Sequence, residues 1–160
     1  MLYSKDCLSN MKKYIIFGIC LLLVMIALVI ANTIHKNRTI EDVTYFYFSV
    51  SGGMDPDSNI DYKLSNDTII YKKGYYANEK RVPVTKEFKE ELLKIINEEK
   101  IAGWDGFNKV DKHVLDGSGF SLEIKYSDKD YIRANGYVNY PDNYRSFSNR
   151  IYKLFEQYTK

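Results

Sequence analysis

The sequence predicts a two-layer α+β domain that follows one membrane-spanning helix. Three observations lead to this prediction. Residues 14–34 contain no charged side chain and are mostly apolar. Five segments rich in β-branched and aromatic residues follow, three before a helical pattern and two after it. A second helical pattern closes the chain, so the order βββ-α-ββ-α predicts an antiparallel sheet of about five strands with two helices on one face.

The apolar segment at residues 14–34 is the first element. Its apolar side chains lie on every side of a helix, so it has no polar face with which to rest on a membrane surface. A span of roughly 20 residues crosses a hydrocarbon core about 30 Å thick. The length favours an uncleaved anchor. A signal peptide cleaved after Ala31 is the alternative, because Val29 and Ala31 occupy the positions that signal peptidase reads.

Basic residues beside the anchor predict its orientation. Three precede it, together with the amino terminus, and two follow it: Lys5, Lys12 and Lys13, then Lys36 and Arg38. The side richer in Lys and Arg stays in the cytoplasm. We therefore expect residues 1–13 to form a cytoplasmic tail, residues 35–42 a tether, and residues 43–160 an exported domain at the cell membrane.

The composition excludes several classes of function. The chain has 23 Lys and Arg against 21 Asp and Glu, which argues against a nucleic-acid-binding protein. Both cysteines, Cys7 and Cys20, lie among the first 20 residues. The predicted domain therefore has no disulfide framework, no cysteine-ligated zinc site and no cysteine nucleophile. No phosphate-binding glycine loop occurs, and no cofactor is expected.

The first three strands are predicted between residues 43 and 72. Residues 43–50 are dense in aromatic and β-branched side chains and stop at Gly52-Gly53. Apolar and polar side chains alternate over residues 60–65, and the turn at Asn66-Asp67 leads into residues 68–72. This pattern is typical of three antiparallel strands that follow one another in the chain.

The first helix of the domain is predicted to begin after Thr85, whose hydroxyl suits an N-cap. Its apolar residues recur at spacings of three and four and form one face: Phe88, Leu92, Ile95 and Ile96. Residues 101–107 end the helix and include Trp104, which is expected to fold back over the sheet.

A second hairpin and a closing helix complete the domain. Residues 120–126 and 131–135 alternate around the turn at residues 127–130. The closing helix is predicted to start near Pro141 and Asp142. Its apolar stripe consists of Tyr144, Phe147, Ile151, Leu154, Phe155 and Tyr158.

Four segments resemble small envelope proteins and lipoproteins of Gram-positive anaerobes, a group of uncharacterised proteins. The segments are Trp104–Phe107, Val114–Gly117, Phe120–Tyr126 and Gly136–Pro141. The resemblance covers roughly residues 100–158 and implies an export or anchor segment joined to a small α+β domain, with no activity attached. The chain departs from lipoproteins because the residues before Cys20 are not a small-residue lipid-attachment motif.

Tyrosine is unusually frequent, with 15 in the chain. Many of these side chains are expected on the sheet face opposite the helices, where they would form a binding surface, because tyrosine offers a large area with a polar tip. The candidate residues for this surface are Tyr45, Tyr47, Tyr75, Tyr76, Trp104, Tyr131, Tyr137 and Tyr140. The alternative is plain cross-strand packing on a half-exposed sheet.

Two acidic segments are candidate sites of a different kind. The first contains Asp105, Asp111, His113 and Asp116. Their convergence would permit acid-base catalysis or metal binding, and a solvated loop is the alternative. The second, Asp55 to Asn59, alternates oxygen ligands as a calcium loop does, but Ile60 and Asn66 stand where that loop needs Gly and Glu. A polar turn is therefore favoured there.

Taken together, these features predict a single-pass membrane protein whose exported domain is a non-enzymatic binding or interaction module at the cell envelope. Its partner would be an envelope protein or a cell-surface ligand. One alternative is a small envelope enzyme or metal-dependent hydrolase that uses the first acidic segment. The other is a structural accessory subunit of a membrane complex. No residue is assigned as catalytic or as a metal ligand.

Overall fold

The computed structural model describes residues 5–53 and 55–160, and it divides the chain into two units, Met1–Lys36 and Asn37–Lys160. The first unit contains a single helix, α1 (Lys5–Lys36). Within α1, Lys12–Ile34 has a mean hydropathy of 3.1, and none of its hydrophobic window is buried. By length and composition this helix is able to cross a membrane, and a signal sequence near the N-terminus would meet the same criterion. The predicted tail is helical from Lys5 onward, and residues 1–4 lie outside the described residues.

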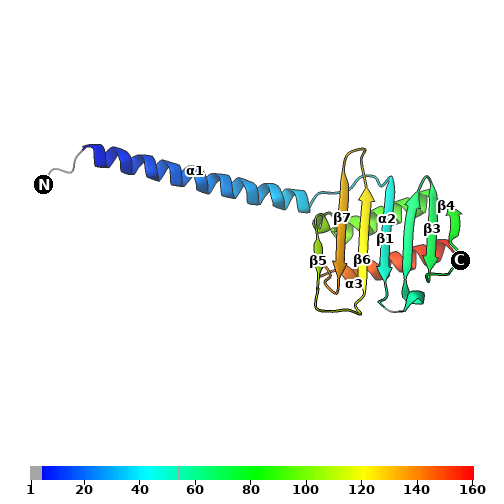
Figure 1. Ribbon diagram of the computed structural model, residues 1–160. Coiled ribbons are helices and arrows are strands. Elements are labelled where there is room, and N and C mark those ends of the chain that lie inside the picture. Colours follow the sequence, from blue (N-terminus) through cyan, green and yellow to red (C-terminus); the bar gives the residue numbers. More distant parts are fainter. Residues whose placement is uncertain (1–4, 54) are drawn as a thin grey trace. The chain divides into compact units, whose positions relative to one another are not determined.

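The second unit is an α+β domain in which one sheet carries helices on one face (Figure 1). The strands are β1 (Tyr45–Ser51), β2 (Ile60–Ser65), β3 (Thr68–Lys73), β4 (Lys80–Pro83), β5 (Asn108–Val110), β6 (Gly119–Lys125) and β7 (Tyr131–Tyr137). The helices are α2 (Lys86–Glu98) and α3 (Tyr144–Tyr158), with short 3-10 turns η1 (Pro56–Ser58) and η2 (Ile101–Trp104). The strand order is β4-β3-β2-β1-β6-β7-β5.

The α+β class is confirmed, but the sheet has seven strands rather than about five. The two additional strands, β4 and β5, form the edges. β4 has four residues and ends in Pro83, and β5 has three exposed residues, so neither contains a periodic apolar pattern. β5 also pairs with β7 in parallel, whereas the other pairs are antiparallel. The sheet is therefore mixed.

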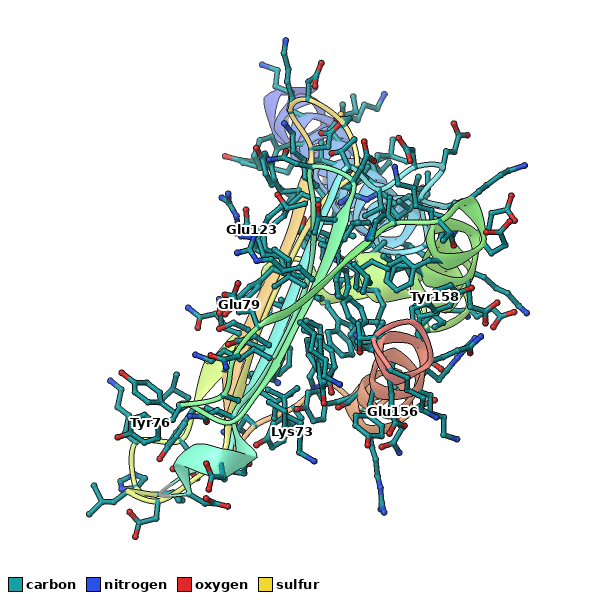
Figure 2. All side chains as sticks on the ribbon, turned by 90° about the vertical axis from the view of Figure 1, so that its right-hand side faces the viewer. Lys73, Tyr76, Glu79, Glu123, Glu156 and Tyr158 are labelled. Atoms are coloured by element: carbon teal, nitrogen blue, oxygen red, sulfur yellow. The ribbon has the colours of Figure 1, made fainter. Side chains whose placement is uncertain are left out.

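The register gives the central strands one apolar face and one polar face. Phe46 and Phe48 of β1 are fully buried beneath the helices, whereas Tyr45 and Tyr47 point to the opposite side because successive side chains alternate. Figure 2 shows the sheet edge-on, with α2 and α3 on one side and Glu123 on the other. The helices contribute eight further core residues: Phe88, Leu92, Ile95, Ile96, Phe147, Ile151, Leu154 and Phe155.

The two helices begin in different ways. Thr85 caps α2 as predicted, because its hydroxyl accepts a hydrogen bond from the Phe88 amide at 3.2 Å. α3 begins at Tyr144, a few residues after the predicted start. Its N-cap residue, Asn143, makes no capping bond and instead accepts from the Trp104 indole at 2.9 Å. This contact ties the start of α3 to η2.

Residues 37–43 belong to the folded domain, so the predicted tether at residues 35–42 is largely wrong. Ile40 and Val43 are buried in the core. Two hydrogen bonds join Ile40 to Asn97 of α2: the Ile40 amide donates to the Asn97 side-chain oxygen, and the Asn97 side-chain nitrogen donates to the Ile40 carbonyl, both at 2.8 Å. The Arg38 guanidinium lies 4.7 Å from the Tyr126 ring centre and 3.8 Å from the Asp105 carboxylate. The domain thus begins immediately after α1 ends.

Candidate binding surface

The sheet face turned away from α2 and α3 is called the open face below. In the register of the strands, one row across it runs from β4 to β7 through Arg81, Ile70, Lys63, Tyr47, Glu123 and Arg133. Its side chains are polar, charged or tyrosine except at a few positions such as Ile70. Among the described residues of the second unit, neither α2 nor α3 covers this face (Figure 2).

Four of the predicted tyrosines project from the open face. Tyr45 and Tyr47 lie on β1, and Tyr131 and Tyr137 lie on β7. All four are partly buried by their neighbours. Because β6 separates β1 from β7, these side chains form two columns on either side of one strand. The structure therefore brings together half of the candidate residues.

The other four candidates lie elsewhere. Trp104 is only 4% exposed, and its ring packs in the core against Phe147, with 5.1 Å between ring centres, so it is not a surface residue. Tyr140 follows β7 and packs against Tyr144 of α3 at 4.5 Å, on the helical side. Tyr75 and Tyr76 are exposed, but they lie in the turn after β3 and do not extend that strand.

Gly74 explains why β3 ends before these two tyrosines. Its φ of +91° is a left-handed conformation that favours glycine, and its amide donates to the Asn59 carbonyl at 2.7 Å. The chain therefore turns away from the sheet. Tyr76 remains 83% exposed at the end of the domain, where Figure 2 shows it near η1 and far from the helices.

Hydrogen bonds and cations fix the tyrosines of the open face. The Tyr47 hydroxyl donates to the Asp61 carboxylate at 3.1 Å. The Tyr137 hydroxyl accepts from the Gly117 amide at 2.8 Å and donates to the Leu115 carbonyl at 2.9 Å. Burial, and to a lesser extent the Glu123 charge, raises the pKa of Tyr45, so that its hydroxyl remains a donor at neutral pH. These groups form a fixed polar surface.

The open face is hollowed at two places. One groove of about 420 Å³ lies at the Tyr45 end and is lined by Thr44, Tyr45, Ser65, Asn66, Glu123, Lys125 and Tyr131. A second of about 270 Å³ lies at the other end, where small side chains such as Ser49, Ser51 and Ser121 leave space beside Tyr137. Hydroxyl and amide groups line both ends, and the Tyr45 end adds the Lys125 ammonium and the Glu123 carboxylate, so the face suits a polar ligand.

A larger groove, about 630 Å³, lies between α2 and α3 and does not coincide with the open face. Three carboxylates and three cations line it: Glu87, Glu90, Glu91, Lys94, Arg150 and Lys153. Its floor includes Ile95 and Leu154, which belong to the core. Because its charges are mixed and its floor is core packing, this groove favours no particular ligand.

The four residues of the predicted acid-base site are not brought together. Asp105 accepts from the Arg133 amide at 3.1 Å, whereas the Asp111 amide donates to the Tyr137 carbonyl at 3.1 Å. Arg133 and Tyr137 are separated by about 13 Å along β7, at roughly 3.3 Å per residue. His113 and Asp116 are exposed in the loop after β5. Among the described residues, no three His, Cys, Asp or Glu side chains are grouped so that they could hold a metal ion.

The acidic segment before β2 is a turn. Asp55 accepts from the Asp57 amide at 3.0 Å and thereby caps η1. The Asn59 side chain accepts from the Gly52 amide at 3.0 Å. Both side-chain oxygens therefore bind the backbone of their own loop.

No protein-family model matches the chain, and no curated protein is significantly similar to it. The function is therefore inferred from the geometry of the domain.

Proposed function

We propose that the chain is a single-pass membrane protein that presents a non-enzymatic binding domain outside the cytoplasm, with the open face as its binding surface. In this proposal α1 contains the anchor, and the excess of lysine before residues 14–34 supports a cytoplasmic N-terminus. The ligand is an envelope protein or another cell-surface molecule. The resemblance to small envelope proteins supports the same location.

The observation that carries this proposal is the contrast between the two faces of the sheet. One face is closed by α2 and α3, which supply the core. The open face instead holds Tyr45, Tyr47, Tyr131 and Tyr137 among hydroxyl and charged groups. Tyrosine and hydroxyl side chains are typical of recognition surfaces because they combine contact area with hydrogen bonding at low entropic cost.

Cysteine labelling tests the location. Cys7 precedes the predicted span and residues 21–160 contain no cysteine, so Lys153→Cys adds one thiol on the exposed surface of α3. A membrane-impermeant maleimide should label the variant in intact cells and the wild type only after the cells are opened. Labelling of wild-type Cys7 in intact cells, without labelling at position 153, would overturn the orientation. Cleavage after Ala31 would remove both native cysteines and would be detected in the intact mass.

A photo-crosslinking residue tests the binding surface. Placed at Tyr47 in the centre of the open face, it should yield a cross-linked product in intact cells. The matched control places the same residue at Lys153, on the helical side of the domain. A product at position 153 and none at position 47 would exclude the open face as the binding surface.

A further inference from the structure

The open face is more positively charged than the remainder of the domain. Its strands carry five cations and two carboxylates: Lys63, Lys72, Arg81, Lys125 and Arg133, with Asp61 and Glu123. Glu79, which pairs with Arg81, adds a third carboxylate on the same side (Figure 2). Residues 39–160 contain 18 Lys and Arg and 20 Asp and Glu, which leaves 13 basic and 17 acidic residues elsewhere. The domain is therefore polarised, with net positive charge on the one face that the helices leave uncovered.

Three of the five cations have no carboxylate partner among the described residues. Arg81 is paired with Glu79 at 2.6 Å and Arg133 with Glu123 at 3.3 Å. The other three are lysines that each lie over a tyrosine ring: Lys63 over Tyr45 at 5.7 Å, Lys72 over Tyr75 at 5.7 Å, and Lys125 over Tyr131 at 5.9 Å. A ring beneath an ammonium group restricts its position without cancelling its charge. These three side chains, the lysine set, can therefore still bind an anion.

The lysine set follows a diagonal across four adjacent strands. Lys125 on β6 lies opposite Tyr45 of β1, and Lys63 on β2 lies opposite Tyr47, two residues further along β1. Lys72 on β3 lies opposite Asp61 of β2, which is itself opposite Ser49, a further two residues along β1. With strands about 4.8 Å apart and about 6.7 Å between same-face residues, the Cα atoms of Lys125 and Lys63 are about 12 Å apart and those of Lys63 and Lys72 about 8 Å.

We propose that the open face binds a linear anionic polymer of the phosphodiester type, which lies across β6, β1, β2 and β3 along the lysine set. This inference deepens the proposed function and rests on it. Repeated phosphate groups would meet successive ammonium groups, which are strong donors to phosphate oxygens. At one end, the groove of about 420 Å³ around Lys125 adds Thr44, Ser65 and Asn66 as further hydrogen-bonding groups for the linking units.

The acidic loops favour a chain-like ligand over a charged membrane. The β2–β3 and β6–β7 turns lie at one end of the sheet, and the β1–β2 and β5–β6 loops lie at the other (Figure 1). The first pair contains Asp67, Asp128 and Asp130 with Lys129, and the second contains Asp55, Asp57, Asp111 and Asp116 with Lys112. A planar anionic bilayer laid on the open face would approach both acidic ends and be repelled there. A single chain that crosses the strands between them would meet mainly the lysine set.

The test measures binding of soluble poly(glycerol phosphate) to the full chain in zwitterionic nanodiscs. The test variant carries Lys63→Gln, Lys72→Gln and Lys125→Gln. The matched control carries Lys86→Gln, Lys94→Gln and Lys153→Gln, which removes the same charge from exposed positions of the helical layer. Three lost ion pairs should weaken binding by roughly tenfold or more in the test variant. The slope of log K against log salt should also become shallower by about 2, whereas the control should keep the wild-type slope.

A second variant and three possible outcomes complete the test of the polymer proposal. Replacing the lysine set by arginine should preserve binding, and this variant separates loss of charge from loss of folding. Equal weakening by the two glutamine variants, or no binding by the wild type, would overturn the proposal. Binding to phosphatidylglycerol vesicles without binding to the soluble polymer would identify a membrane as the occupant and overturn it too. In each of these cases, a cross-link at Tyr47 would still support the open face as the binding surface. A wrong choice of ligand is therefore distinguishable from a wrong choice of binding surface.

Discussion

Replacing Asn97 by alanine should loosen the segment that joins the domain to α1. The change removes both 2.8 Å hydrogen bonds to the backbone of Ile40, a residue that is only 2% exposed. Two such bonds, with buried partners left unpaired, contribute roughly 1–3 kcal/mol. The better helix propensity of alanine offsets about 0.6 kcal/mol of this loss. We therefore expect the free energy of unfolding to fall by about 1.5 kcal/mol, which corresponds to a fall in Tm of roughly 4–8 °C for a domain of this size.

Trp104 provides the measurement, because it is the single tryptophan of the chain and is buried in the core of the domain. Its fluorescence should report urea unfolding of the full chain in mild detergent. Trypsin should also cut the variant after Arg38, which is partly buried in the wild type. Asn108→Ala is the matched control, since Asn108 is exposed on β5 and its loss should cost less than about 0.5 kcal/mol. If both variants lose the same stability and Arg38 stays protected, Asn97 does not hold the segment.

Three further predictions concern the core and its titratable groups. Phe155→Ala should cost about 3–5 kcal/mol in urea unfolding, because this fully buried ring packs against Phe46, Tyr62 and Phe88. Burial disfavours the charged form of Glu99, but hydrogen bonds from Ser146, Arg150 and Asn143 outweigh this effect and lower the pKa of its carboxyl group. The stability of the domain should therefore fall as the pH drops below about 4.5. Glu99→Gln should remove part of that pH dependence. Burial raises the pKa of Tyr144 to about 12, so in an absorbance titration this phenol should ionise later than a phenol with the ordinary tyrosine pKa of about 10, and the associated stability should be lost as the pH rises from 10 towards 12. A Tyr144→Phe variant with an unchanged late phase in the titration would contradict the last assignment.

Elements with a periodic apolar pattern were predictable from the sequence. The alternation in β1, β2 and β6 and the spacing of apolar residues in α2 and α3 correspond to their buried faces. β4 and β5 were missed because edge strands need hydrogen bonds on one side only and bury almost nothing. The packing of residues 37–43 against the domain was also not predicted, because it depends on hydrogen bonds between Ile40 and Asn97, which are 57 residues apart in the sequence. No local pattern signals such a contact.

The candidate surface was predictable in part, for the same physical reason. Strand alternation places Tyr45, Tyr47, Tyr131 and Tyr137 on one face, whereas tyrosines in turns obey no such rule. The same alternation would have placed Lys63, Lys125 and Arg133 beside them, because each is next in sequence to a core residue that faces the helices. The acidic residues around Trp104 are close in sequence but not in space, because the strand β5 lies between Asp105 and Asp111 and separates them. Asp105 and Asp111 are only six residues apart, yet they contact β7 at Arg133 and at Tyr137, about 13 Å apart along the strand.

The distribution of ion pairs is what distinguishes the open face from an ordinary solvated sheet surface. Such a surface usually pairs its charges across strands, and here the register would allow it, since Asp61 lies directly opposite Lys72. The Asp61 carboxylate instead accepts from the Tyr47 hydroxyl, and Glu123 pairs with Arg133. Both carboxylates are thus engaged away from the lysine set. A face that served only solubility would gain nothing from leaving three lysines without carboxylate partners, because like charges repel, whereas unpaired ammonium groups are available to an anionic ligand.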